Sequence, residues 1–421
     1  EILNLIKTNK KKLDLKDINN FKGVNLEIPP PNINSDLSTN ICMILAKLNN
    51  LDPNKLASNV REIIKANIED FKKVEIAKPG FININLSNNA LIKIINNIFS
   101  EGKNFGSKKT NYSFNIEFVS ANPTGPMHVG HCRGAIFGDV LSNLLKFNGN
   151  KVTKEYYIND YGNQINNFVK SVFFRIREIQ FNEKFSNDGD LYPGEYIKDI
   201  AKKILSKKKE DFDSFEKNYN FLAEESLNQS MEMIKSDLNK LGISHDNFVS
   251  EKNIVKSNSV NKAIDDLKKN KYVEEGYLEP PKGEEKKDWK KSKRLIFKSI
   301  LFGDDSNRAL QKNDGTWTYF ANDLAYHYNK VSRNFDKLIN ILGADHTGYV
   351  KRIEGAVQAL SENKTSLECK VCQLVKLYKN GLPFKMSKRA GDFISVNDLL
   401  NEVNKDSIRF MMLNRSHDVE L

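Results

Sequence analysis

The sequence predicts an α/β protein in which a Rossmann-like domain built on a parallel sheet follows a small α+β domain and precedes the start of a helical region. A strand at 114–119, a helix at 128–147 and a strand at 151–158 follow one another, and this order is the repeating unit of a parallel sheet. Upstream of these, helical and alternating patterns are mixed, which indicates an α+β domain. With 421 residues, of which 39% are hydrophobic, the chain has room for about two to four domains.

The segment 1–86 is expected to be the small domain. Its helices are predicted where capping residues precede apolar residues at helical spacing, and its strands where apolar residues alternate. Ser35, Asp36 and Ser38 are the expected caps of the first helix, and Asp52 is expected to open the second. The predicted elements are helices at 35–48 and from 52 onward, strands at 74–77 and 80–86, and a helix at 87–99. The remainder of 87–110 is interpreted as a linker.

The segment 111–392 is expected to be the Rossmann-like domain, with helical insertions between its strands. Beyond the strand–helix–strand unit, short apolar runs predict more strands and amphipathic runs predict more helices. These further elements are strands at 338–342 and 369–377 and helices at 162–177 and 195–241.

Two stretches late in the chain are less regular. The stretch 279–299 is interpreted as a surface loop, and a nucleic-acid-binding patch at 286–294 is less favoured because acidic residues dilute its charge. A helix is predicted at 399–414. It belongs to the segment 393–421, which we interpret as the start of a helical domain whose remainder is absent.

Composition narrows the class of protein. The net charge of +11 suits a polyanionic partner, although many Lys residues sit in short runs typical of solvated helix surfaces. No stretch reaches about 18 uninterrupted apolar residues, so no membrane span is predicted, and the N-terminus lacks the apolar core of a signal peptide. The small number of Cys residues favours the cytoplasm. Cys369 and Cys372 form a single CxxC in a predicted strand, so we interpret them as structural and predict no metal site.

The stretch from Glu117 to His131 carries the first chemical signal. A strand ends, a Pro- and Gly-rich loop turns, and a helix opens with His128 and His131. The first turn of a helix attracts phosphate through its free N–H groups and its dipole. Two His residues three apart share one face, and Gly130 between them lets a flat group approach the backbone. This arrangement favours a site for adenine and phosphates. A metal site is less favoured because no third ligand lies nearby in the sequence, and simple capping of the helix would not need two His residues.

The second signal is KMSKR at 385–389, which follows a predicted strand. Lys385, Lys388 and Arg389 place three cations within five positions. Such a segment can close on a triphosphate, and Lys388 would neutralise a departing pyrophosphate. Alone, the segment is more typical of a solvated basic turn, but its combination with the upstream histidines favours nucleotide chemistry.

Together these segments resemble the signature motifs of class I aminoacyl-tRNA synthetases. HVGH at 128–131 resembles HIGH, and KMSKR resembles KMSKS, with Val129 and Arg389 as departures. Over essentially its whole length, the chain resembles the arginyl-tRNA synthetases in particular. This closer resemblance is carried by the run 117–134, YINDYGNQI at 157–165, FGDDSNR at 302–308, WTYFANDLAYH at 317–327, LGADHTGY at 342–349 and the run 376–391.

The resemblance implies a set of site residues. Carboxylates are natural partners of a guanidinium, and the family uses an acidic residue before the HIGH loop and a Tyr-x-x-x-Asp pair. The residues implied for arginine are Glu117, Ser120, Asn122, Tyr319 and Asp323. Those implied for ATP are Gly125, Gly130, Gly343, Asp345, His346, Met386 and Ser387. Those implied for catalysis are His128, His131, Lys385 and Lys388.

The resemblance also implies a reaction in two steps. The carboxylate of L-arginine would attack the α-phosphate of ATP, with Mg²⁺ as cofactor, to give arginyl-adenylate and pyrophosphate. The 2′-hydroxyl of the terminal adenosine of tRNA(Arg) would then take the arginyl group. The N-terminal domain is expected to contact the tRNA elbow, activation is expected to require bound tRNA, and the enzyme is expected to be a monomer.

Three alternatives are less favoured. A cysteinyl-tRNA synthetase would need a zinc thiolate site, which a single CxxC in a strand does not supply. A small nucleotidyltransferase with an HxGH motif would be shorter and would lack the KMSKR segment. A non-catalytic RNA-binding paralogue would be expected to lose motif residues, yet both His residues and both Lys residues are present.

Overall fold

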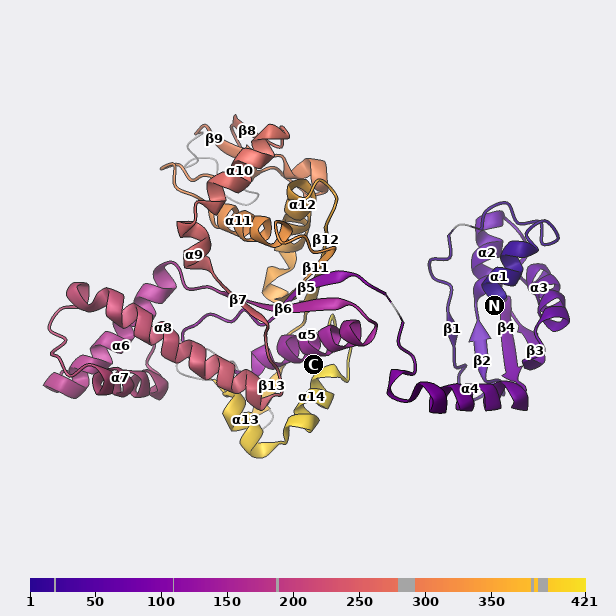
Figure 1. Ribbon diagram of the computed structural model, residues 1–421, viewed down its shortest axis with the longest axis horizontal. Coiled ribbons are helices and arrows are strands. Elements are labelled where there is room, and N and C mark those ends of the chain that lie inside the picture. The colour runs from indigo at the N-terminus through magenta and orange to yellow at the C-terminus, as the bar shows by residue number, and fades with distance from the viewer. Residues whose placement is uncertain (19, 109, 187–188, 279–291, 380–381, 385–392) are drawn as a thin grey trace. The chain divides into compact units, whose positions relative to one another are not determined.

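The computed structural model describes the chain except for residues 19, 109, 187–188, 279–291, 380–381 and 385–392 (Figure 1). The described chain forms two compact units, Glu1–Ser107 and Lys108–Leu421. The predicted site residues Lys385, Met386, Ser387 and Lys388 lie outside the described residues, as does most of the charged stretch 279–299. Within the described parts, no helix combines the length and apolar character needed to cross a membrane.

The first unit is a four-stranded antiparallel sheet covered by helices. Its strand order is β1-β2-β4-β3, and its core contains the fully buried residues Leu45, Ile64 and Ile82. The strands are β1 Leu26–Glu27, β2 Leu37–Thr39, β3 Phe71–Ala77 and β4 Phe81–Leu86. The helices are α1 Ile2–Thr8, α2 Ile41–Asn49, α3 Pro53–Asn67, α4 Asn88–Glu101 and the short η1 Gly102–Asn104.

The predicted helix at 35–48 is wrong over its first residues. Leu37–Thr39 forms β2, which pairs with β4, and the helix begins only at Ile41. Pairing across the sheet decides the conformation here: the carboxylate of Asp36 accepts a hydrogen bond from the backbone N–H of Leu86 at 2.8 Å instead of capping a helix. The prediction for Asp52 is confirmed, since its carboxylate accepts from the N–H of Lys55 at 2.6 Å.

The second unit is built on a five-stranded parallel sheet. Its strand order is β12-β11-β5-β6-β7, and every neighbouring pair is parallel. The chain first builds the sheet in one direction from β5 and later returns to build it in the other direction from β11, so the switch of direction lies between β5 and β11. Ligands of open α/β sheets bind beyond the carboxyl ends of strands at such a point. The strands are β5 Ser113–Glu117, β6 Lys151–Ile158, β7 Asn247–Ser250, β11 Lys337–Gly343 and β12 Ser366–Cys372.

Helices and two small sheets surround the parallel sheet. Helices α6, α7 and α8 pack on one another as a separate group with its own core (Figure 1). The helices are α5 Val129–Phe147, α6 Asn163–Phe181, α7 Glu195–Lys207, α8 Phe215–Lys240, α9 Glu251–Lys256, α10 Ser259–Lys269, η3 Ser299–Phe302, α11 Tyr319–Val331, η4 Ala344–Tyr349, α12 Val350–Leu360, α13 Val396–Glu402 and α14 Lys405–Leu413. The remaining strands are β8 Val273–Gly276, β9 Arg294–Phe297, β10 Arg308–Ala309, β13 Leu377–Lys379 and β14 Leu382–Phe384.

Several elements of this unit differ from the prediction. The helix predicted at 195–241 is two helices, because Phe212 turns into the core between them and Ser214 caps the second. The helix predicted at 399–414 is also two, with Asn404 capping α14. The strand predicted at 369–377 ends at Cys372, where the backbone leaves the sheet to bond the C-terminal segment. The stretch interpreted as a loop at 279–299 includes β9.

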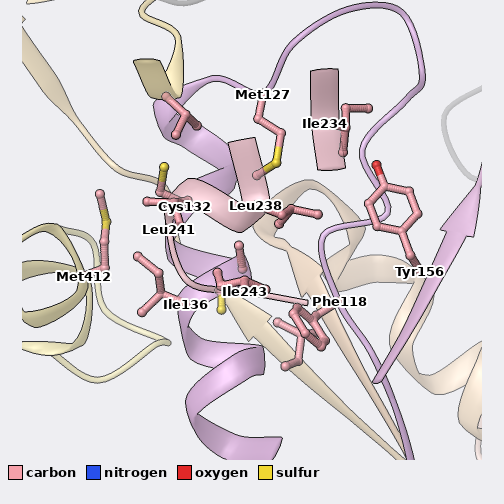
Figure 2. Packing of buried hydrophobic residues seen from close by; sticks show 14 of the residues in the cluster. Phe118, Met127, Cys132, Ile136, Tyr156, Ile234, Leu238, Leu241, Ile243 and Met412 are labelled. Carbon is pink, nitrogen blue, oxygen red and sulfur yellow. The ribbon is translucent and has the colours of Figure 1, made fainter. Parts of the chain in front are cut away.

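The two faces of the parallel sheet differ in chemistry. One face is apolar and packs on α5, α8 and α14, as Figure 2 shows around Cys132, Ile136, Leu238 and Met412. The other face carries buried polar side chains. Asn340, Glu117 and Glu155 stand side by side on β11, β5 and β6, and each has a hydrogen-bond partner on α11. The polar face continues to the carboxyl ends of the strands, where the candidate site lies.

Candidate active site

The loop between β5 and α5 is held in a strained and specific shape. Val119 and Ser120 both have positive φ, at 70° and 39°, which is rare for residues other than glycine. At Gly125, with φ of 133°, an added Cβ would lie 2.4 Å from the ring of Tyr196, so only glycine fits. The backbone N–H of Met127 donates to a buried carboxylate of α8 at 2.9 Å. The loop therefore presents the start of α5 in a fixed position.

His128 and His131 lie together at the N-terminus of α5. Their rings stack with centroids 3.8 Å apart, and the backbone N–H of His128 donates to Nδ1 of His131 at 3.2 Å. A ring nitrogen that accepts a hydrogen bond carries no proton, so neutral His131 carries its proton on Nε2. Gly130 between them is exposed. This arrangement can offer an imidazole N–H to an anion that lies over the helix end.

The chain returns to this helix end directly after residues 385–392. The N–H of Val129 donates to the carbonyl of Ile394 at 3.1 Å, and the N–H of Val396 donates to the carbonyl of Met127 at 3.1 Å. His128 and Ser395 form an isolated antiparallel bridge between these bonds. The two signature segments, more than 250 residues apart in the sequence, are thus linked at Ile394, only six residues after Lys388.

Glu117 is fixed from two sides. The residue is 8% exposed; one carboxylate oxygen accepts from Ser120 Oγ at 3.0 Å and the other from the ammonium of Lys330 at 2.6 Å. Ser120 Oγ in turn accepts from the backbone N–H of Tyr157 at 3.1 Å. The strained loop, β6 and α11 therefore all meet at this carboxylate.

A chain of hydrogen bonds runs from Lys330 to the backbone of Asp323. The ammonium donates to Asn340 Oδ1 at 2.8 Å, so the amide nitrogen of Asn340 donates to His327 Nε2 at 2.9 Å. His327 then carries its proton on Nδ1 and donates it to the carbonyl of Asp323 at 2.8 Å. Burial, with a contribution from the charge of Lys330, lowers the pKa of His327 to about 4. Neutral His327 is therefore a structural link in this chain of hydrogen bonds.

Two carboxylates at the site form no ion pair with another described residue. Burial raises the pKa of Asp323 to about 6, and the charge of Glu117 adds to the shift. The hydroxyl of Tyr349, which donates at 2.6 Å, and the more distant charges of His346 and Arg352 oppose it. Burial and the charges of Asp323 and Asp160 raise the pKa of Glu251 to about 7. Within the described parts of the chain, no basic group lies within ion-pair distance of Asp323 or Glu251. A cation bound here would relieve both shifts.

The structure does not gather every predicted site residue. Tyr319 lies on α11 with Asp323 but is 78% exposed, with Lys312 Nζ 5.8 Å from its ring centre. Asn122 is exposed in the loop. Asp345 and His346 follow the carboxyl end of β11 with exposed side chains 3.5 Å apart, and Gly343 precedes them.

The CxxC residues lie in strand β12. Burial raises the pKa of Cys369 to about 12 and that of Cys372 to about 11, so both are protonated at neutral pH. In the described part of the chain, no cluster of three or more His, Cys, Asp or Glu residues is arranged to hold a metal ion.

Comparison with known proteins decides the family. Residues 94–420 match the family model described as tRNA synthetases class I (R), catalytic domain, and residues 1–86 match the arginyl tRNA synthetase N terminal domain. The arginine–tRNA ligase of Pelagibacter ubique is 54% identical over 100% of this chain and 74% of its own length. The arginine–tRNA ligase of Bartonella quintana is 43% identical over 99% of this chain and 74% of its own.

The chain belongs to the arginyl-tRNA synthetases. Solved structures agree: a putative arginyl-tRNA synthetase from Campylobacter jejuni matches with a TM-score of 0.68 at 36% identity, over 80% of this chain and 70% of that one. The Thermus thermophilus arginyl-tRNA synthetase shares the fold, with a TM-score of 0.67 at 17% identity. The match covers 100% of this chain and 75% of the Thermus chain. The predicted family, Rossmann-like fold and enzyme class, an arginine–tRNA ligase that uses ATP, are thereby confirmed.

Sequence analysis missed several polar residues of this arginyl-tRNA synthetase site. Lys330 could have been found, because Asp323, His327 and Lys330 have the spacing i, i+4 and i+7 and so share one face of a helix. Glu251 follows β7, and the carboxyl end of a strand is a signal, but β7 itself was not predicted. Tyr349 gave no such signal, since only the folded chain brings its hydroxyl to Asp323.

Proposed function

We propose that this arginyl-tRNA synthetase binds the guanidinium of L-arginine between Glu117 and Asp323, activates the amino acid with ATP and transfers it to tRNA(Arg). The observation that carries the pocket is the excess of buried negative charge. Glu117 is already paired with Lys330, whereas Asp323 and Glu251 have raised pKa values and form no ion pair with a described residue. A guanidinium supplies both the positive charge and the several N–H donors that such a site accepts.

The strained loop positions the other end of the amino acid. Ser120 is bonded to Glu117 and to β6, and Asn122 follows it at the exposed part of the loop. In the proposal these two residues hold the amino and carboxylate groups of arginine. Tyr319 is assigned to the guanidinium; because it is exposed here, this assignment requires its side chain to turn toward Asp323 when arginine binds.

ATP is assigned to the start of α5 and the carboxyl end of β11. His128 and His131 face the helix end, where Nε2 of His131 can donate to the α-phosphate as charge develops on it. Gly130, which is exposed, leaves room for the nucleotide, whereas Gly125 is assigned to ATP through the loop that its close packing on Tyr196 holds in place. Met386 and Ser387 are assigned to ATP from the family motif alone. Gly343, Asp345 and His346 are assigned to the ribose and adenine.

The proposed chemistry needs no covalent bond to the protein. The arginine carboxylate attacks the α-phosphate, pyrophosphate leaves, and Lys385 and Lys388 balance its charge. The 2′-hydroxyl of the terminal tRNA adenosine then attacks the carbonyl of the adenylate and AMP leaves. The described residues offer no cluster to hold Mg²⁺, so the ion is proposed to arrive on the ATP phosphates, and no step is assigned to it.

The roles of the domains are proposed from the resemblance to the arginyl-tRNA synthetases. Residues 1–86 would contact the tRNA elbow, 87–110 would connect them to the catalytic domain at 111–392, and 393–421 would start a helical anticodon-binding region. The net charge of +11 supports an RNA partner. We propose that the enzyme acts as a monomer, and in the cytoplasm, where charged tRNA is used.

Arginine-dependent exchange of pyrophosphate into ATP tests this proposal. The exchange is measured with each of the twenty amino acids, with and without tRNA(Arg). Exchange with arginine alone, and only when tRNA is present, is the expected result. Exchange driven by another amino acid would overturn the arginine pocket and leave the class I chemistry in place.

A further inference from the structure

The hydroxyl of Tyr157 is buried without a protein partner. Tyr157 lies near the carboxyl end of β6 and is 6% exposed, and its ring stacks on Tyr326 of α11 with centroids 4.0 Å apart. No described residue forms a hydrogen bond with its oxygen. Buried polar atoms nearly always have a partner, so an exception requires a physical reason. The stacked ring prevents the side chain from turning away to find one.

Tyr157 lies beside the carboxylates of the candidate site. It follows Glu155 by two residues on β6 and so shares the polar face of the sheet, and its backbone N–H donates to Ser120 Oγ, which itself donates to Glu117. The negative charges of Glu251, Asp323, Glu117 and Asp160 all act on the phenol, whose pKa is raised first by burial and then by these charges. Three of these carboxylates are held by other groups: Glu117 by Lys330 and Ser120, Asp323 by Tyr349, and Asp160 by Ser250 Oγ at 2.6 Å and the backbone N–H of Lys252 at 2.9 Å. The phenol oxygen bonds to none of them.

We propose that Tyr157 is a specificity-determining residue of the arginine pocket, whose hydroxyl oxygen accepts a hydrogen bond from the guanidinium of the substrate. The inference rests on the proposed pocket between Glu117 and Asp323. A guanidinium has five N–H donors, and part of the acceptor capacity of both carboxylates is already used by protein groups. The phenol oxygen adds an acceptor at a place where the surrounding charge favours a cation and disfavours an anion.

This role predicts an unusual combination of effects for Tyr157→Phe. The substitution removes a hydroxyl that contributes no bond to the folded protein, so the melting temperature should stay the same or rise. Arginine, however, loses an acceptor in a dry, charged site, and its affinity should fall about tenfold or more. A residue with a merely structural role would show the reverse, with lower stability and unchanged affinity.

The chain offers a matched control. Tyr192 is 1% exposed in the core formed with α6 and α7, and its hydroxyl also has no partner among the described residues. Tyr192→Phe should leave both stability and arginine affinity unchanged. Tyr156→Phe serves as the stability reference, because its hydroxyl donates to the carbonyl of Ala121 at 2.8 Å and its loss should lower the melting temperature.

The experiment is calorimetric titration of the full chain and its variants with L-arginine and with agmatine, which keeps the guanidinium but lacks the carboxylate. Equal losses of affinity for both ligands in Tyr157→Phe support the proposal. A loss for arginine alone would place the hydroxyl at the carboxylate end and overturn it, as would a lowered melting temperature. Unchanged arginine affinity in Tyr157→Phe but not in Asp323→Asn would overturn the role of Tyr157 alone. Unchanged affinity in both variants would overturn the pocket itself.

Discussion

The ammonium of Lys330 lies 2.6 Å from a carboxylate oxygen of Glu117 in the interior of the protein, where the lysine side chain is fully buried and the glutamate nearly so. The pair joins α11 to β5 at the carboxyl edge of the sheet. It also neutralises Glu117. In the proposed pocket, Glu117 would therefore supply oxygens in a fixed orientation, and Asp323 and Glu251 would supply the charge that attracts a cation.

Lys330→Met should therefore destabilise the fold. The substitution leaves Glu117 buried without its cation, and breaking a buried pair on one side costs about 3–5 kcal/mol of unfolding free energy. Urea unfolding measures this loss of unfolding free energy. The control is Lys262→Met, an exposed residue of α10, which should change stability by less than about 0.5 kcal/mol. A loss below about 1 kcal/mol for Lys330→Met would mean that the buried pair is dispensable.

Arginine binding should depend on pH through Asp323 and Glu251. Their pKa values of about 6 and about 7 are raised, so both groups gain protons as the pH falls through 7 to 6, and arginine affinity should fall with it. Bound arginine lowers both pKa values, so binding at pH 6.5 should release protons. Titration calorimetry in two buffers of different ionisation enthalpy counts them. Binding without proton release would contradict the assigned charges.

The same shifts have a consequence for stability without ligand. Because the folded state holds these two protons more tightly than the unfolded chain, it binds more protons between about pH 4 and 7, and the contribution of both groups to stability falls as the pH rises through that window. Arginine should therefore raise the melting temperature more at pH 7.5 than at pH 5.5. Thermal unfolding with and without arginine at the two values measures the difference, and an equal rise would count against the proposal.

His131→Ala should impair activation far more than tRNA binding. His131 Nε2 is proposed to donate to the α-phosphate, and loss of such a donor typically costs about 10²–10³ in rate. Single-turnover formation of arginyl-adenylate measures the first effect and a filter-binding assay with tRNA(Arg) the second. Equal losses in both assays would show that the histidine supports the structure of the helix end instead.

The sequence predicted the regular elements where local pattern and tertiary packing agree. β6 was predicted with the observed bounds because Lys151–Ile158 is rich in β-branched and aromatic residues, and α5 because a long apolar stripe follows His128. The helix predicted at 35–48 was placed too early in the chain, because Leu37–Thr39 pairs with a strand that lies more than 40 residues later. No local pattern reports such a pairing.

Some residues of the candidate site were predicted from the sequence, and others meet only in the fold. Glu117 and Asp323 were predicted from the resemblance, and the structure places both at the carboxyl edge of the sheet with their charges coupled. The chain of Lys330, Asn340 and His327 was not predicted, since its members come from α11 and β11 and meet only in the fold. The buried hydroxyl of Tyr157 was not predicted either, because the absence of a partner is a property of packing.

The affinity of arginine for the Asp323→Asn variant tests the guanidinium pocket directly. It is measured by titration calorimetry beside the wild type, with citrulline as the uncharged analogue and with Asp265→Asn, an exposed substitution on α10, as the control. Asp323→Asn should lose about 2 kcal/mol or more of arginine binding free energy, while Asp265→Asn should bind as the wild type does. Citrulline should bind the wild type far more weakly than arginine. Unchanged arginine affinity in Asp323→Asn, or citrulline bound as tightly as arginine, would contradict the proposal that a carboxylate at this edge of the sheet recognises the guanidinium.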